Sequence, residues 1–234
     1  MPFREYFRSH PAAVRVAPFV IFVLITAGQG KFGAASAYWF YLAKTLAGLG
    51  MVLAMRPLVA EMRWAFSWEA VVVGVGVLVM WIGLDPHYPM AGELFAKIGL
   101  GSGVKTAVVN ADPNLVFGAH SPLALFFLAV HVLGMTFVVP PLEEVFYRSF
   151  LYRYIASQNF LAVPLNRFLP LPFLATAVLF GFEHNQWLAG ILCGAAFQWL
   201  VLRKNRLGDA MTAHAITNFL LGLWVVTRGA WQFW

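Results

Sequence analysis

The feature that most constrains this chain is its series of long apolar runs. Several of them have the ~20 residues that a helix needs to cross a bilayer. Only 11% of the 234 residues are charged, whereas a soluble domain has roughly 25%. The core of a bilayer offers the backbone no water, so such runs fold as helices. The sequence therefore predicts an all-α, polytopic integral membrane bundle of about 7–8 transmembrane helices.

The expected spans follow the apolar runs, with two ambiguities. Residues 141–157 form a further helix, which either continues the preceding span through a kink at Pro140–Pro141 or starts separately. The run 172–184 is short, so it is either a half-helix or extends further back. The expected spans are residues 14–29, 38–55, 69–84, 122–139, 172–184, 187–203 and 210–227.

The basic residues predict the orientation of the bundle, because positively charged loops favour the cytoplasmic side of a membrane. Lys44 falls within a span. With the N-terminus inside, most other basic residues lie inside, and the outside holds only Lys31, Lys97, Lys105 and Arg228. This asymmetry indicates a cytoplasmic N-terminus. It also accounts for the net charge of +6 without a nucleic-acid partner.

Two adjacent carboxylates, Glu143 and Glu144, lie in the segment PPLEEVFYR. Ionisable groups are costly in an apolar region and are usually functional there. Arg148 follows Glu144 by four residues, so the two side chains share a helix face and can pair. Glu143 points about 100° away and lacks that partner. The pattern favours a structural Glu144 and a chemically active Glu143. The alternative is a set of charges at a membrane boundary without chemistry.

Two further polar pairs follow, in FGFEH and HAITN. Phe180 and His184 are four residues apart, as are His214 and Asn218, so each pair shares a helix face. A His and an Asn one turn apart offer two hydrogen-bond donors, which a developing oxyanion needs. His184, if it lies beside Glu143, could hold and activate a water molecule.

Three other residues receive structural interpretations. Glu183 is expected to reach the water interface rather than the site, because burying another acid is costly. His131 is expected to be a satisfied structural histidine. The single cysteine, Cys193, cannot form an internal disulfide and is interpreted as a packing residue.

The motifs EEVFYR, FGFEH and HAITN, in this order on late spans, resemble those of the CAAX-protease and bacteriocin-processing family. These proteins are intramembrane glutamic endopeptidases related to the Ras-converting CAAX endoprotease. The resemblance covers about residues 120–226. It implies one integrated membrane domain in two parts. Residues 1–121 supply N-terminal transmembrane helices and an external loop, and residues 122–227 supply the CAAX-protease-like catalytic core.

Carried over residue by residue, the resemblance implies an active site among the late helices. Its catalytic residues would be Glu143 as general base, His184 as the residue that helps to polarise the attacking water, and His214 and Asn218 as the oxyanion hole. Its supporting residues would be Glu144, Arg148 and Phe180. We expect these groups to converge on one cavity near the cytoplasmic leaflet.

The resemblance implies no metal and no cofactor. The implied partners are the lipid bilayer and a membrane-associated protein or peptide substrate, lipidated or not. The stretch WLAGILCG looks more like a bacterial branch of this family. We therefore expect a multi-pass protein of the inner (cytoplasmic) membrane.

Two alternatives belong to other functional classes. The first is a metal-dependent membrane hydrolase whose ligands are Glu143, Glu144, His184 and His214, since zinc accepts such donors. Against this alternative, the sequence contains no HExxH motif, and a metal site of this kind would give Asn218 no role. The second is a non-catalytic immunity or scaffold protein, or a proton-coupled carrier. Intact motifs disfavour a degenerate scaffold, and the sequence shows no inverted repeat of the kind that carriers often have.

Overall fold

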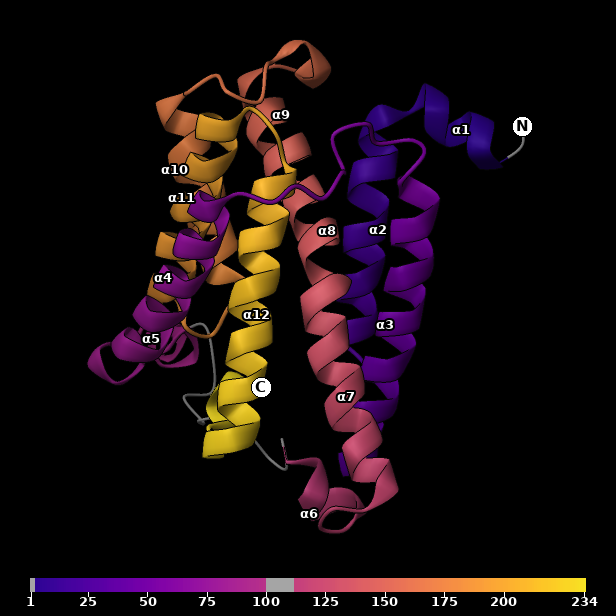
Figure 1. Cartoon of the computed structure of the whole chain (residues 1–234), viewed down its shortest axis with the longest axis vertical. Coiled ribbons are helices and arrows are strands. Elements are labelled where there is room, and N and C mark those ends of the chain that lie inside the picture. Colours follow the sequence, from indigo (N-terminus) through magenta and orange to yellow (C-terminus); the bar gives the residue numbers. More distant parts are fainter. Residues whose placement is uncertain (1–2, 100–111) are drawn as a thin grey trace.

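The computed structural model describes residues 3–99 and 112–234, and in these residues every regular element is a helix (Figure 1). The predicted all-α membrane class is confirmed. The elements are α1 (Phe3–Ser9), α2 (Pro11–Thr26), α3 (Ala34–Met55), α4 (Trp68–Leu84), η1 (Asp85–His87), α5 (Ala91–Lys97), α6 (Pro113–Phe117), α7 (Pro122–Phe137), α8 (Val139–Glu144), η2 (Val145–Leu151), α9 (Tyr152–Ala156), η3 (Phe160–Ala162), α10 (Pro170–Phe182), α11 (Trp187–Lys204), α12 (Gly208–Arg228) and η4 (Trp231–Phe233).

The expected spans coincide with α2, α3, α4, α7, α10, α11 and α12, with boundaries that differ by a few residues. Ala34–Met55, Pro122–Ala156 and Gly208–Arg228 are long and apolar enough to cross a membrane. Pro11–Thr26, Trp68–Leu84 and Pro170–Phe182 are shorter apolar helices. Large apolar side chains cover the outside of the bundle, including Leu24, Leu46, Leu53, Val72, Val79, Leu125, Leu174 and Leu223. A soluble monomer rarely exposes so much contiguous apolar surface.

The ambiguity around residues 141–157 is resolved in favour of a continuation. Elements α7, α8, η2 and α9 follow one another as a helical stretch of 35 residues, Pro122–Ala156. Pro140 and Pro141 are tolerated because they lie in the first turn of α8, where a missing N–H costs little. At 1.5 Å per residue the stretch is ~52 Å long, so Glu143 and Glu144 lie well inside the bundle. Element η2 is π-helical, a conformation that is frequent at functional sites.

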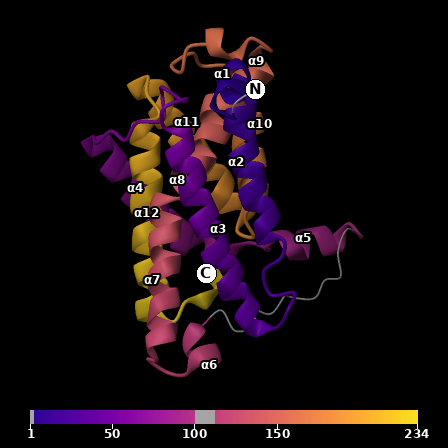
Figure 2. The ribbon, with the colours of Figure 1, turned by 90° about the vertical axis from the view of Figure 1, so that its right-hand side faces the viewer.

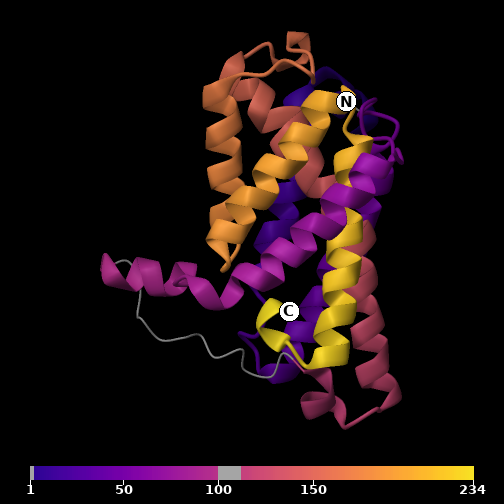
Figure 3. The ribbon, with the colours of Figure 1, turned by 60° about the vertical axis from the view of Figure 1, so that its left-hand side comes forward.

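Helix α10 is too short to cross a bilayer. Its 13 residues span only ~20 Å, against a hydrocarbon thickness of about 30 Å. The 172–184 run is therefore a half-helix, and the turn between α10 and α11 lies at membrane depth. Irregular backbone at this depth requires partners within the protein. Ala91 N–H donates to the Asn185 carbonyl at 2.8 Å, and the Trp187 indole donates to the Pro89 carbonyl at 2.9 Å. Figure 3 shows α5 running sideways below this hairpin.

Glycines let α10 and α11 approach closely. A Cβ atom at Gly190 would lie 2.8 Å from the Cα of Gly181. Small residues at an interface between membrane helices allow backbones to come into contact, where dispersion forces hold them. The α10–α11 hairpin therefore depends on these two positions.

We expect Gly181→Ala to destabilise the protein. The added methyl group would clash with the Ile191 side chain and lie 2.7 Å from the Trp187 carbonyl oxygen. Overpacking of this kind costs ~1–3 kcal/mol, which should lower the thermal midpoint in detergent. The matched control is Gly76→Ala, because no atom lies within 4 Å of a Cβ at that position of α4. Equal midpoints for the two variants would contradict this packing.

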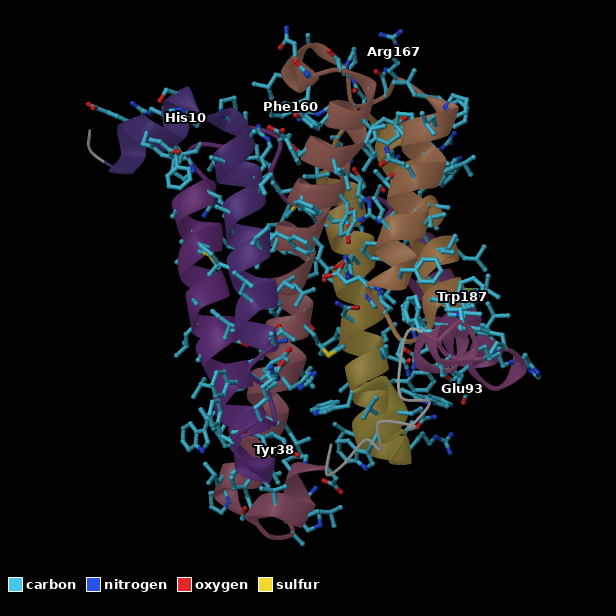
Figure 4. All side chains as sticks on the ribbon, turned by 180° about the vertical axis from the view of Figure 1, so that it is seen from behind. His10, Tyr38, Glu93, Phe160, Arg167 and Trp187 are labelled. Carbon is cyan, nitrogen blue, oxygen red and sulfur yellow. The ribbon has the colours of Figure 1, made fainter. Side chains whose placement is uncertain are left out.

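The two ends of the bundle differ in charge. The turns 56–67, 157–169 and 205–207 gather at the end that holds the N-terminus, and α5, α6 and the C-terminus lie at the other (Figures 1 and 2). Figure 4 places His10, Phe160 and Arg167 at the first end and Tyr38 at the opposite one. We call the first the basic end, since it holds the turns and helix termini that carry Arg8, Arg15, Arg56, Arg63, Arg153, Arg167, Arg203, Lys204 and Arg206.

A buried ion cluster joins three segments at the basic end. The Glu61 carboxylate accepts from Arg15 Nη2 at 2.8 Å and from Arg153 Nη2 at 2.7 Å. The Ser149 hydroxyl also donates to it. Burial by itself would raise the pKa of Glu61, but Arg15 and these hydrogen bonds outweigh burial, and the pKa lies below its usual value.

This cluster predicts a loss of stability in acid. The folded-state pKa of Glu61 is below its unfolded value of ~4.3. The stabilisation is therefore complete above that value and is lost as the pH falls through the folded pKa. We expect Glu61→Gln to lower the thermal midpoint at pH 7 and to reduce the fall of the midpoint between about pH 5 and about pH 2, the range in which a depressed carboxyl group takes up its proton. Glu93→Gln on α5 is the control. A wild-type pH dependence in Glu61→Gln would refute this role.

Candidate active site

The Glu144 carboxylate is the centre of a buried polar cluster. Its residue is fully buried. Its Oε2 forms an ion pair with Arg148 Nε at 3.2 Å, and its Oε1 accepts a hydrogen bond from His214 Nδ1 at 3.0 Å. Since an ionised carboxylate only accepts hydrogen bonds, the proton in the second contact belongs to Nδ1 of the histidine. The ion pair expected from the spacing is present, and the histidine additionally joins α8 to α12.

Arg148 is almost completely buried and its charge is compensated on several sides. Besides the pair with Glu144, Nη2 donates to the Gly194 carbonyl at 3.3 Å. The guanidinium carbon lies 4.4 Å from the centroid of the Phe180 ring, where the ring face attracts a cation. Phe180 thus packs against the cluster from α10.

Glu143 lies beside the cluster without a close partner. Its Oε2 is 3.8 Å from Nε2 of His214, and its side chain is 10% exposed. In the described part of the chain, this oxygen has no hydrogen-bond partner. Such an unsatisfied buried oxygen in a native structure calls for a functional or solvent explanation. The two adjacent glutamates therefore occupy different environments.

His184 lies in the turn between α10 and α11. Its Nδ1 is 2.9 Å from the Phe180 carbonyl oxygen. Because a carbonyl only accepts, Nδ1 carries the proton, and Nε2 of the neutral ring keeps its lone pair. The ring centroid lies 5.3 Å from that of Trp81 and 5.0 Å from that of Phe180. The histidine is therefore oriented as a hydrogen-bond acceptor.

Asn218 lies one turn after His214 on α12. Its Nδ2 donates to the Met135 carbonyl at 2.8 Å, which ties α12 to α7. An amide nitrogen has two N–H groups, so one remains for another acceptor.

A cavity of about 450 Å³ lies among these residues, within the range of ligand-binding sites in proteins. We call it the site cavity. His184, His214, Asn218 and Phe180 line it. Glu143 adjoins it through His214, and Glu144 lies behind. Its other lining residues include Thr26, Gln29, Tyr41, Lys44, Trp81, His131, Met135, Glu183, Asn185, Gln186, Cys193, Gln232, Phe233 and Trp234.

The position of the site cavity corrects one expectation. Its wall runs from His214 to the Gln29 turn, the α10–α11 turn and the C-terminal Gln232, all on the side away from the basic end. If the basic end is cytoplasmic, the cavity lies toward the opposite side of the membrane. The two expectations, a cytoplasmic basic end and a cavity near the cytoplasmic leaflet, therefore cannot both hold. The expectation for the cavity rested on the basic loops that flank the late spans, and these loops do not show toward which end of the helices the cavity lies.

Lys44 is a cavity residue that sequence reasoning left without a role. Its ammonium donates to the Thr26 hydroxyl at 3.1 Å and lies over the rings of Tyr41 (4.6 Å) and Phe22 (4.9 Å). The signal was available, because a lysine inside a span is costly and usually functional. The sequence does not show which face of α3 packs against the late helices, so it could not place Lys44 at the cavity.

Three residues with structural interpretations also line the cavity. Glu183, at the C-cap of α10, is exposed but lines the cavity, so the expectation that it lies away from the site is wrong; it accepts from the Tyr147 hydroxyl at 2.8 Å. His131 is stacked between Tyr41 and Trp234, with centroids 3.9 and 3.8 Å away. Cys193 is buried, as a packing residue should be.

The His and Glu side chains of the alternative metal-dependent hydrolase do not form a recognisable metal site. Among residues 3–99 and 112–234, no three His, Cys, Asp or Glu side chains are grouped to hold one ion. Glu144 and His214 are bonded to each other rather than directed at a shared point.

Comparison with known protein families finds a match in the late helices. Residues 124–220 match the family described as type II CAAX prenyl endopeptidase Rce1-like. Over these residues the chain is similar to this family. The match contains all three motifs and confirms the resemblance predicted from them. It supports a membrane endopeptidase in general terms. No curated protein and no solved structure matches the chain.

The polar cluster predicts that Arg148 and Glu143 differ in their contribution to the stability of the fold. Removing one partner of a buried ion pair leaves an uncompensated charge, at a cost of about 3–5 kcal/mol. We therefore expect Arg148→Ala to lower the thermal midpoint in detergent strongly. Glu143→Ala should leave it largely unchanged, because Glu143 Oε2 makes no hydrogen bond in the described residues and only a 3.8 Å contact with His214. Equal thermal midpoints for Arg148→Ala and Glu143→Ala would contradict the view that the Glu144–Arg148 pair is structural and Glu143 is not.

Proposed function

We propose that this protein is an intramembrane endopeptidase that hydrolyses a peptide bond of a membrane-associated protein. The observation that carries the proposal is the position of Glu143. Its Oε2 makes no hydrogen bond in the described residues and lies 3.8 Å from Nε2 of His214, which lines the site cavity together with His184 and Asn218. The Rce1-like match over residues 124–220 agrees with this chemistry.

The first step is activation of a water molecule by Glu143 and His184. Both offer acceptors, since Glu143 Oε2 is unpaired and His184 Nδ1 is already bonded to the Phe180 carbonyl. A water that donates its two protons to these acceptors directs a lone pair toward the substrate carbonyl. As the oxygen attacks the carbonyl carbon, one proton moves to Glu143. When the C–N bond breaks, Glu143 returns this proton to the leaving amine.

The second element is stabilisation of the oxyanion by His214 and Asn218. The hydrogen bond from His214 Nδ1 to Glu144 fixes the ring, and Nε2 can donate to the oxyanion when both ring nitrogens carry a proton. The second N–H of Asn218 supplies the other donor. Preorganised donors of this kind stabilise charge that exists only after attack.

The remaining assignments complete the proposal. Glu144, Arg148 and Phe180 are supporting residues that hold His214. We also propose that the bundle divides at residue 121 into N-terminal helices and a catalytic core. The two parts are not independent, because Lys44 of α3 and Trp81 of α4 line the same cavity. The charge asymmetry supports a cytoplasmic N-terminus in a bacterial inner membrane.

The experiment that tests the proposed function compares membrane proteomes by sequencing C-terminal peptides. Cells that carry the wild-type protein should contain one or more new C-termini that are absent with Glu143→Ala. Glu93→Gln is a matched control that also removes a carboxylate, and it should retain the new C-termini. Activity of purified protein should also survive a metal chelator. Identical proteomes for wild type and Glu143→Ala would refute the proposal.

A quantitative prediction concerns Asn218. We expect Asn218→Ala to lower single-turnover cleavage by roughly 10²–10³, the usual loss for one oxyanion donor. Substrate binding should change little, because this contact strengthens only in the transition state. Asn218→Asp should be at least as damaging, since a carboxylate has no N–H.

Because Asn218 also bonds the Met135 carbonyl, the thermal midpoint of each variant must be measured beside its activity. Full turnover in Asn218→Ala would leave this residue only its packing role. It would also weaken the assignment of the oxyanion hole to α12.

A further inference from the structure

The site cavity and the basic end lie at opposite ends of the same bundle. Three separate segments form the cavity wall farthest from the basic end. They are the turn after α2 with Gln29, the α10–α11 turn with Asn185 and Gln186, and the C-terminal segment with Gln232. Gln186 Nε2 donates to the Gln232 carbonyl at 3.2 Å, which holds two of these segments together. This wall is polar, as expected where a cavity meets water.

Packed apolar side chains close the path from the basic end to the site. Val59, Leu142, Val145, Phe197, Leu207 and Met211 are at most 1% exposed and belong to one core cluster. The Glu61 ion cluster ties the same region together. A hollow of about 940 Å³ does lie at the basic end, lined by residues such as Arg56, Arg63 and Pro141. None of the proposed catalytic residues lines it, so it is a separate feature.

The short α10–α11 hairpin explains why access is one-sided. It enters from the basic end and turns at membrane depth, so His184 is presented toward the opposite side. On that side the bundle is completed by shorter pieces, namely α5, η1 and η4. The site cavity, which His184 lines, is bounded on that side by Gln232 and Phe233 near the C-terminus.

From these observations and the charge asymmetry, we propose that the site cavity opens to the non-cytoplasmic side of the membrane. Its substrate is then an exported, membrane-anchored protein whose scissile bond has already crossed the bilayer. This rests on the proposed function for the nature of the substrate, but the sidedness of the cavity can be tested without any cleavage.

The test measures cysteine accessibility in membrane vesicles of both orientations. The native Cys193 is buried and is first replaced by Cys193→Ala. Three neutral positions are then changed in turn, so that the charge asymmetry is retained. Gln158→Cys reports on the basic end, Ala119→Cys on the opposite end and Asn185→Cys on the cavity. All three positions are exposed. The probe is a sulfonated maleimide that does not cross membranes.

We expect Asn185→Cys and Ala119→Cys to be labelled in right-side-out vesicles and protected in inside-out vesicles. Gln158→Cys should show the reverse. Labelling of Asn185→Cys from the same side as Gln158→Cys, from both sides or from neither would overturn the proposal. So would a complete inversion of all three patterns. Failure of the proposed function is distinguishable, because unchanged C-termini with Glu143→Ala would leave this labelling pattern intact.

Discussion

The Glu144 carboxylate is a charge without access to water, and much of the structure is arranged around it. An isolated ion of this kind would be prohibitively costly to bury. It is tolerated because Arg148 and His214 bond to it from two different helices. Arg148 in turn requires Phe180 and the Gly194 carbonyl. The association of α8, η2, α10, α11 and α12 thus follows from satisfying one carboxylate.

The same cluster makes two neighbouring glutamates different. Neither Oε2 has a hydrogen-bond partner in the described residues. Glu144 Oε2 nevertheless lies 3.2 Å from Arg148 Nε, whereas Glu143 Oε2 lies 3.8 Å from His214 Nε2. A single histidine links them, with Nδ1 toward one and Nε2 toward the other. Any change in the proton content of this ring is therefore felt on both sides. The structural pair and the proposed chemical group are coupled through one imidazole.

The sequence predicted most of the fold because membrane insertion leaves few choices. Apolar length identified the spans, and the i, i+4 spacing identified the Glu144–Arg148 pair. It could not settle whether Pro140 and Pro141 end a helix, since proline is tolerated equally well in the first turn of a continuing one. Lys44 was missed for a different reason, because the face of α3 that meets the late helices depends on contacts between distant segments.

The position of Lys44 and Trp81 has a consequence for relatives of this protein. Both line the cavity, yet they come from α3 and α4, which precede the stretch that is similar to the Rce1-like family. The motif-bearing helices can therefore stay constant while the early helices change the shape and charge of the chamber. Proteins grouped by their shared motifs would then have a common chemistry and divergent selectivity. Exchanging the first three long helices between two such proteins is accordingly a route to transferring substrate preference.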